Sequence, residues 1–244
     1  MRYAIISDIH SNLEALTAVL ARIAELKVDA VLCLGDIVGY NASPNECIDI
    51  VRREGIACIL GNHDTRAAGL KVPTDFNAAA MRAIQWTREQ LTEESRQFLR
   101  GLPAEQTMYG FFIFHGKIHD TDHYILSKED VKEGFALLAK IKGSPTPGFF
   151  GHTHLRTAYS LSGKAFAIEG AKELHLEKKK RYLINPGSVG QPRDRDPRAA
   201  FLVYDREKEV VFFHRTEYDI QACQEKIIRA GLPSRLAERL VAGW

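Results

Sequence analysis

The sequence contains few cysteines and no motif that pairs them. Four cysteines occur in 244 residues, and none forms a C-x-x-C pair. Cys33 and Cys58 lie within apolar runs, where a thiol behaves as a small hydrophobic side chain. This usage is typical of a reducing compartment rather than of a secreted, disulfide-bonded domain.

The sequence also lacks a long hydrophobic run. A membrane-spanning helix needs about 18 or more consecutive apolar residues, and no stretch approaches that length. The apolar stretch after Met1-Arg2 ends before Ser7-Asp8, which is too short for the hydrophobic region of a signal peptide. We therefore expect a cytoplasmic protein that has no membrane partner.

Neither sign of charge is in clear excess. The chain has 33 basic and 31 acidic residues and a net charge of +2, which gives no field of the size that binds nucleic acid. The basic run 178–181 follows Glu173 and Glu177 and is typical of a solvated turn. The chain contains no internal repeat, low-complexity segment or linker. These absences favour a single α/β domain over 1–244 and disfavour nucleic acid as a partner.

What the sequence does contain is five short polar motifs, each of which follows a short apolar run. Such runs, bounded by glycine or polar residues, indicate buried strands. Open α/β sheets bind ligands in the loops just past the ends of such strands. The motifs supply carboxylate, imidazole and amide groups, which bind divalent metals. They are Asp8-Ile9-His10, Gly35-Asp36, Gly61-Asn62-His63-Asp64, His115-Gly116 and Gly151-His152-Thr153-His154.

The order and content of these motifs resemble the calcineurin-like metallophosphoesterase superfamily, and within it the small bacterial phosphodiesterases. The resemblance implies a four-layer αββα sandwich in which helices flank two mixed β-sheets. It also implies two divalent cations that share the carboxylate of Asp36. One cation would be held by Asp8, His10, Asp36 and His154. The other would be held by Asp36, Asn62, His115 and His152.

By the same resemblance, His63 contacts the phosphate or protonates the leaving oxygen, and Asp64 orients the His63 ring. The chemistry supports these roles independently. Two cations about 3.5–4 Å apart clamp the attacking and leaving oxygens at phosphorus and acidify a bridging water. An imidazole beside them serves as a general acid, and a carboxylate on its other nitrogen fixes its tautomer.

A sixth segment, from Asn185 to Arg193, resembles a loop of the bacterial phosphodiesterases. Its glycines permit close backbone approach to a ligand, and the guanidinium group of Arg193 suits a phosphate. The alternative is an ordinary connection in which residues 193–196 form a solvated charge cluster. Residues 116–124 contain further His and Asp side chains, which form either a solvated loop or a third, weaker cation or substrate site.

Two departures separate the chain from the Ser/Thr protein phosphatases that share similar motifs. Those enzymes carry Asp-Arg-Gly soon after the shared aspartate, whereas Asp36 is followed by a segment without arginine. They also carry glycine where this chain has Ser11. Tyr40 and Asn41 follow Asp36 and either line the substrate cleft or belong to an ordinary loop.

Periodicity predicts the remaining frame. A capping box at Ser11 should begin one helix and Pro44–Glu54 should form a second, which gives parallel strand–helix–strand crossovers. Residues 74–101 have a helical composition and either cap the cleft or pack outside it. Short strands are expected at 107–114, 147–150, 156–161, 164–169, 181–184, 199–205 and 209–215. Further helices are expected at 128–141, 218–230 and 233–241.

The sequence thus predicts a dinuclear metal-dependent phosphoesterase that hydrolyses phosphodiester bonds of a small molecule or nucleotide through a metal-bridging hydroxide. A phosphomonoesterase and a dinucleoside polyphosphate hydrolase remain alternatives, because the same centre serves all three. A non-catalytic scaffold of the same fold is a further alternative. Mixed imidazole and carboxylate ligands accept Mn, Fe, Zn, Ni or Co, and we favour Mn or Fe. The sequence leaves the oligomeric state open.

Overall fold

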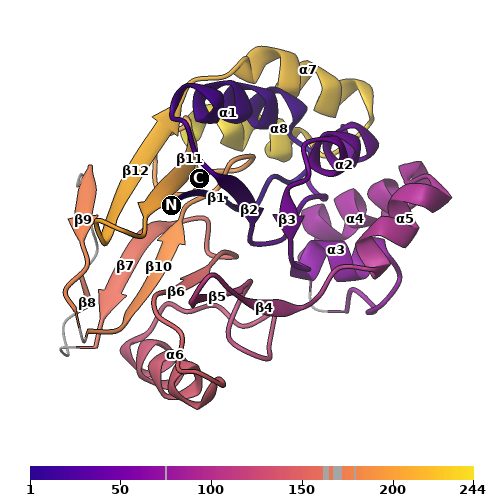
Figure 1. The fold of residues 1–244 in the computed structure, drawn as a ribbon. Coiled ribbons are helices and arrows are strands. Elements are labelled where there is room, and N and C mark those ends of the chain that lie inside the picture. Colours follow the sequence, from indigo (N-terminus) through magenta and orange to yellow (C-terminus); the bar gives the residue numbers. More distant parts are fainter. Residues whose placement is uncertain (75, 162–164, 167–171, 179) are drawn as a thin grey trace.

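Two six-stranded mixed sheets form the centre of the protein in a computed structural model, which describes residues 1–244 except 75, 162–164, 167–171 and 179. The first sheet has the order β3-β2-β1-β11-β12-β9 (Figure 1). Strands β1, β2 and β3 are parallel, and β11, β12 and β9 are antiparallel to their neighbours. The bounds are β1 Arg2–Ile6, β2 Ala30–Cys33, β3 Ala57–Cys58, β9 Glu173–His175, β11 Ala199–Asp205 and β12 Val210–Thr216.

The second sheet has the order β4-β5-β6-β10-β7-β8. Strands β5, β6 and β10 run parallel, and the outer strands are antiparallel to them or to each other. The bounds are β4 Glu105–Met108, β5 Phe111–Phe114, β6 Gly148–Phe150, β7 Arg156–Ser160, β8 Ala165–Phe166 and β10 Tyr182–Pro186. Both sheets therefore contain a parallel part whose strands end at a common edge.

Alternating side chains explain how the sheets stack. Tyr3 and Ile5 of β1 pack against Phe111 and Phe149 of the second sheet, so these residues fill the space between the sheets. The alternate side chains of the same strands point to the outer faces of the sheets, where helices pack on them. On the first sheet, Ala4 and Ile6 meet helix α1, Leu13–Glu25, and helix α2, Pro44–Arg53. On the second sheet, helix α6, Lys128–Lys140, covers Phe112 and Phe150.

These layers give the order helix, sheet, sheet, helix, which confirms the predicted four-layer αββα architecture (Figure 1). Beside β3 lie α3, Asn62–Ala67, α4, Ala78–Gln90, and α5, Glu93–Arg100. The chain ends in α7, Ile220–Arg229, and α8, Ser234–Ala242. Helices α4, α7 and α8 share an apolar cluster with Tyr40, and this cluster joins the C-terminal helices to the loop after β2.

Several element boundaries differ from those predicted. The run 107–114 is a hairpin of two strands, because Tyr109 and Gly110 adopt positive φ angles of 49° and 87° and turn the chain. The segment 74–101 is two helices, since the Thr92 side chain caps α5. Helix α1 is capped by Asn12, which accepts the Ala15 N–H, rather than by Ser11.

The structure also adds features that periodicity did not predict. The short strand β9 was not expected, and α3 begins at a residue that was placed in a loop. Of the predicted strand 164–169, only the two residues of β8 lie within the described residues. None of the helices in the described part of the chain combines the length and apolar composition needed to cross a bilayer.

Candidate metal centre

The candidate metal ligands meet at the edge where parallel strands of both sheets end. Asp8 and His10 follow β1, and Asp36 follows β2. Asn62 begins α3 directly after β3. The second sheet contributes His115 after β5, and His152 and His154 after β6. All seven side chains are at most 4% exposed, so the fold brings the whole predicted set into one buried place.

One group of possible ligand atoms comes from Asp8, His10 and His154. The Nε2 atoms of His10 and His154 lie 3.0 Å apart, and His154 Nε2 lies 3.3 Å from Asp8 Oδ1. Asp36 Oδ2 lies 3.5 Å from His10 Nε2. Two ring nitrogens and two carboxylates therefore converge from segments more than 100 residues apart in the sequence.

A second group comes from Asp36, His115 and His152. His115 Nε2 lies 3.3 Å from Asp36 Oδ2 and 3.2 Å from Asn62 Oδ1. The His115 and His152 ring centres are 5.1 Å apart. Asp36 Oδ2 thus faces both groups. It is buried and has no hydrogen-bond partner among the described residues.

Backbone carbonyls fix the orientation of all four candidate histidine ligands. The Nδ1 atoms of His10, His115 and His154 lie 3.1, 2.8 and 2.6 Å from the carbonyl oxygens of Val38, Leu34 and Gln191. His152 is reversed, since its Nε2 lies 3.0 Å from the Asp122 carbonyl. A carbonyl only accepts, so each of these nitrogens carries a proton, and the other nitrogen is the one that offers a lone pair when the ring is neutral.

This arrangement is a specific argument for a cation. The facing Nε2 atoms of His10 and His154 are then both acceptors at 3.0 Å, an unfavourable contact unless a positive charge lies between them. The second hydrogen bond on each ring is the usual support of a metal-bound imidazole. The donor set therefore fits divalent metal ions, and the chain's own carbonyls have already selected the ligand atoms.

The backbone at the centre is held in a conformation that side chains other than glycine seldom adopt. Asp8, His10, Asp36, His152 and His154 all have positive φ angles, between 48° and 66°. Such angles cost of order 1–3 kcal/mol each and persist where the surrounding structure enforces them, often at functional sites. Five of the seven candidate ligands share this strain, which aims their side chains out of the strand direction and into the centre.

Two glycines permit the close backbone packing that enforces these conformations. A Cβ atom on Gly61 would lie 2.0 Å from Asp36 Oδ1, so the start of α3 can press against that carboxylate only without a side chain. A Cβ on Gly190 would lie 1.8 Å from the Ile9 carbonyl oxygen. The 185–193 loop was predicted to approach a ligand through its glycines, but Gly190 instead approaches the backbone between Asp8 and His10.

The charges at the centre also favour cations. Burial opposes ionisation of Asp8 and Asp36, yet the neighbouring imidazoles outweigh it and hold the pKa of each carboxyl below its ordinary value. Burial, with His115 nearby, lowers the pKa of His152 to about 3. Burial likewise opposes protonation of His115, but Asp36 raises its pKa to about 9. Two anionic carboxylates with mostly neutral imidazoles leave a negative centre, which a metal ion complements.

His63 lies beside this centre, between aromatic rings. Its ring centre is 4.4 Å from that of Tyr40, 4.5 Å from that of Phe76 and 4.8 Å from that of His10. Its backbone N–H donates to Asp36 Oδ1 at 2.8 Å. Burial lowers the pKa of His63 to about 4, against the opposing effect of Asp36. The imidazole thus reaches the centre and is positioned by packing.

The predicted contact between Asp64 and the His63 ring is not found. Asp64 Oδ1 accepts the Val38 N–H at 3.1 Å, and Oδ2 accepts the Gly61 N–H at 3.0 Å. The Nδ1 atom of His63 has no hydrogen-bond partner among the described residues. Asp64 therefore joins the loop after β2 to the first turn of α3. Burial, reinforced by Asp36, raises the pKa of Asp64 to about 7.

The 185–193 segment holds the backbone and side chains of the centre in place through hydrogen bonds. Ser188 Oγ donates to the Asp8 carbonyl at 2.8 Å, and His154 Nδ1 donates to the Gln191 carbonyl.

Asn41 is fully buried, and its side-chain amide donates to the His10 carbonyl at 2.7 Å and to the Gly190 carbonyl at 3.4 Å. The structure thus places Asn41 between two backbone segments and not in the cavity wall.

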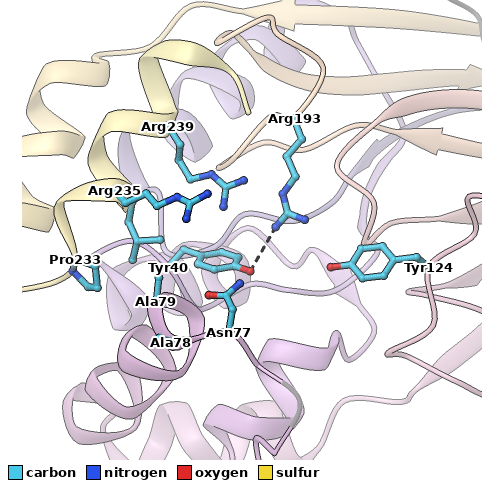
Figure 2. Close-up of a pocket in the computed structure, with 10 residues that line it drawn as sticks. Tyr40, Asn77, Ala78, Ala79, Tyr124, Arg193, Pro233, Arg235 and Arg239 are labelled. Atoms are coloured by element: carbon cyan, nitrogen blue, oxygen red, sulfur yellow. Dashed lines mark hydrogen bonds between the residues drawn. The ribbon is translucent and has the colours of Figure 1, made fainter.

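Arg193 and Tyr40, by contrast, both line a cavity of about 630 Å³ beside the centre. Arg193 Nη2 donates to the Tyr40 hydroxyl at 3.4 Å, and Figure 2 shows both side chains in the cavity wall. We call this cavity the arginine pocket, because three of its lining residues are arginines. Its lining also includes Asn77, Ala78 and Ala79 at the start of α4, within the segment predicted as a possible cap. The described lining residues are Tyr40, Asn77, Ala78, Ala79, Tyr124, Arg193, Pro233, Arg235, Leu236 and Arg239.

Sequence reasoning missed several residues that support the site. Tyr124 stacks on the ring of His152, with ring centres 3.9 Å apart. Arg66 is fully buried and pairs with Asp122, whose carbonyl orients His152. The polar 116–124 loop therefore contributes to the centre through Asp122 and Tyr124. The sequence signal for this pair was weak: Arg66 lies in the last turn of α3, close to the ligand motif, and a buried arginine needs a partner.

Comparison with known proteins gives consistent results. The model of the calcineurin-like phosphoesterase superfamily domain matches residues 1–209. An uncharacterized protein of Methanocaldococcus jannaschii is 38% identical over 245 residues, covering 98% of this chain and 97% of that protein. A metallophosphoesterase from Sphaerobacter thermophilus has a crystal structure with a TM-score of 0.87 and 37% identity. The match covers 100% of this chain and 99% of that one.

A hypothetical protein from Pyrococcus horikoshii shares the fold more distantly. Its crystal structure gives a TM-score of 0.81 at 23% identity and covers 100% of this chain and 98% of that one. The two structures resemble this chain over its full length, including α7 and α8. The family model ends at residue 209, so both C-terminal helices lie outside the residues it matches.

Proposed function

The chain belongs to the calcineurin-like phosphoesterase superfamily and is a metal-dependent phosphoester hydrolase. On this premise we propose that a dinuclear centre hydrolyses phosphodiester bonds of a small molecule or nucleotide. The observation that carries the proposal is the unpartnered Asp36 Oδ2, which lies 3.5 Å from His10 Nε2 and 3.3 Å from His115 Nε2. A carboxylate oxygen that faces two ligand groups is what two neighbouring cations share.

The proposed ligands divide between the two groups. His10, His154 and Asp8 would hold one cation together with Asp36, and His115, His152 and Asn62 would hold the other together with Asp36. Hydrogen bonds to backbone carbonyls support the choice of Nε2 on three rings and of Nδ1 on His152. Imidazole and carboxylate ligands accept Mn, Fe, Zn, Ni or Co, and we favour Mn or Fe.

Hydrolysis needs a nucleophile, charge neutralisation and a proton for the leaving group. Two bound divalent cations would supply a Lewis acid for the phosphoryl oxygens and an acidified water. A water oxygen forms a bond to phosphorus while the ester P–O bond breaks, and the leaving oxygen takes up a proton. His63, which packs beside the centre, would hydrogen-bond the phosphate or give that proton. A bound phosphate anion favours the protonated ring, because opposite charges stabilise each other.

Two cavities support a substrate with groups on both sides of the phosphate. The arginine pocket adjoins the centre through Tyr40, whose ring centre is 4.6 Å from that of His10. A second cavity of about 460 Å³ is lined by His115, Lys117 and Thr65. A diester carries two substituents and can place one in each cavity, whereas a monoester fills at most one. This is our reason to prefer the diester.

The test compares bis(4-nitrophenyl) phosphate with 4-nitrophenyl phosphate, using protein stripped by a chelator and resupplied with Mn²⁺. We expect Mn²⁺-dependent release of nitrophenol, with the higher kcat/KM for the diester, and two metal ions per chain by elemental analysis. A higher kcat/KM for the monoester would favour a phosphomonoesterase. One ion per chain would contradict the dinuclear centre, and failure to bind metal would favour a scaffold.

A further inference from the structure

The arginine pocket contains three guanidinium groups that come from separate parts of the chain. Arg193 belongs to the loop between β10 and β11, and Arg235 and Arg239 lie one turn apart on α8. Figure 2 shows Arg235 and Arg239 extending from α8 toward Tyr40, while Arg193 reaches the same space from its loop. Tyr124 faces Tyr40 from the other side.

No acidic side chain in the described part of the chain neutralises these positive charges. None of the described residues that line the pocket is acidic, and no carboxylate side chain among the described residues pairs with Arg193, Arg235 or Arg239. Arg193 donates to Tyr40 and Gln191, and Arg239 Nε donates to the main-chain oxygen of Trp244. Burial, together with Arg193 and Arg235, lowers the pKa of Arg239 to about 10. Three like charges close together are stabilised by an anion.

The second cavity, which reaches the centre at His115, provides a contrast. Its charged lining residues have both signs, and Lys117 pairs there with Glu133, as His119 does with Glu105. Its charges are therefore largely neutralised within the chain. Of the two cavities, only the arginine pocket is lined by an excess of positive charge.

The pocket is continuous with the candidate centre. Tyr40 in its wall packs on His10 and on His63, and Tyr124 stacks on His152. The backbone N–H of Arg193 donates to the His154 carbonyl at 3.4 Å, so Arg193 lies directly beside the centre. A ligand bound at the metals through one phosphate therefore extends along the two tyrosines toward α8. A volume of about 630 Å³ is within the range that holds a nucleotide-sized group.

We propose that the arginine pocket binds a second phosphate of the substrate, one that is not hydrolysed, with Arg235 and Arg239 of α8 as its specificity-determining residues. The substrate class is then a phosphodiester that carries a further phosphate group, such as a nucleotide diester phosphorylated at a second position. This inference rests on the proposed function for the position of the first phosphate. It assigns a role to a helix that lies beyond the residues matched by the family model.

The test measures binding rather than turnover. Isothermal titration calorimetry on the Mn²⁺-loaded protein compares adenosine 3′,5′-bisphosphate with adenosine 5′-monophosphate. The second phosphate adds charge-assisted hydrogen bonds to guanidinium groups, which are the strong kind, and the monophosphate lacks them. We expect the bisphosphate to bind at least ~10-fold more tightly than the monophosphate. Equal affinities for the two nucleotides would overturn the proposal.

Variants assign this preference to α8. Arg235→Ala should reduce the ratio of the two affinities, and Arg235→Ala with Arg239→Ala should bring it close to one. Arg235 is exposed, so its replacement leaves the packing of α8 in place even if the double variant folds poorly. Arg229→Ala, on neighbouring α7, removes an exposed arginine paired with Glu225 and should leave the ratio unchanged. A ratio that Arg235→Ala leaves unchanged would also overturn the proposal.

The two proposals fail separately. If the protein binds the bisphosphate with the expected preference but hydrolyses no phosphodiester, the proposed function is wrong while the anion pocket stands. If it hydrolyses the diester but binds both nucleotides equally, the proposed function stands and the pocket does not select a second phosphate.

Discussion

The candidate metal centre and the arginine pocket adjoin each other but are built differently. The seven candidate ligands are buried, come from strand ends, and are mostly held in strained backbone conformations. Of the pocket arginines, Arg235 is exposed, Arg193 and Arg239 are half-buried, and two lie on an ordinary helix. The difference reflects what each region has to bind. Metal ligands must be fixed to a fraction of an ångström, whereas a phosphate accepts long, adjustable side chains around it.

The comparison predicts that changes at the centre affect every substrate. Asp36→Asn removes the shared negative charge with almost no change in volume. We expect the content of bound metal to fall and turnover of any phosphoester to drop roughly 10⁴-fold or more, the scale of losing one member of a catalytic unit. Elemental analysis and a 4-nitrophenyl ester assay measure both effects. Asp49→Asn on the exposed face of α2 is the matched control. Retained turnover would refute the shared carboxylate.

His63→Gln should have the next largest effect and should separate the two roles available to this residue. His63 lies with His10 and Asp36 in a group that is geometrically able to bind metal, yet we propose that it contacts substrate. We expect kcat to fall roughly 10²-fold, as for loss of a general acid, with metal content unchanged. Loss of metal would make His63 a ligand. His175→Gln, at an exposed site in β9, is the control.

Arg193→Ala tests the boundary between the candidate metal centre and the arginine pocket. Its guanidinium group lies in the arginine pocket and beside the centre, so its loss should weaken substrate binding without removing metal. We expect KM to rise about 10-fold, equivalent to 1.4 kcal/mol, with a smaller change in kcat. Steady-state kinetics on the preferred ester measure this change, with Arg53→Ala on α2 as the control. An unchanged KM would exclude Arg193 from the site.

The smallest effect is expected outside both regions, at His214 in β12. Its ring stacks on Phe201, its Nε2 has no partner among the described residues, and burial lowers its pKa to about 4. The unfolded chain then binds this proton below about pH 6.5 while the folded chain does not. Stability should therefore fall between pH 6.5 and 4. His214→Phe should show a smaller drop in Tm from pH 7 to pH 5 than the parent. An identical drop in Tm for the two proteins would contradict this, because it would show that the pKa of His214 is the same in the folded and the unfolded chain.

The candidate ligands of the metal centre could be predicted from the sequence because each belongs to a short, local motif. Each ligand motif follows a buried strand, and parallel strands that end at one edge bring such motifs together. The strand-end rule predicted that these motifs meet, the family resemblance assigned Asp36 and His152 to one ligand group, and the structure brings the two side chains together. The role of Asp64 could not be predicted, because its bonds to Val38 and Gly61 depend on how α3 meets the loop after β2.

The arginine pocket was beyond sequence reasoning for a related reason. Arg235 and Arg239 show only the i, i+4 spacing of an amphipathic helix end, which is common on solvated surfaces. Their proximity to Arg193 depends on apolar contacts of α8 with α4 and Tyr40, more than 150 residues earlier in the chain. Asn41 shows the converse case, since a polar residue in a predicted cleft loop is instead buried between two backbone segments.

From the sequence by itself, strand and helix patterns predicted a mixed α/β fold and the motifs supplied the ligand types, because both are properties of neighbouring residues. The four-layer architecture and the class of chemistry followed from the resemblance of those motifs to a known family. Only the tertiary structure decided which imidazole nitrogen faces the centre, which residues hold left-handed conformations, and which charges remain unpaired. Each of these depends on contacts between segments far apart in the chain, such as the Val38 carbonyl with His10 and α8 with Tyr40. Local pattern specifies the groups that are available, and packing specifies the atoms that meet.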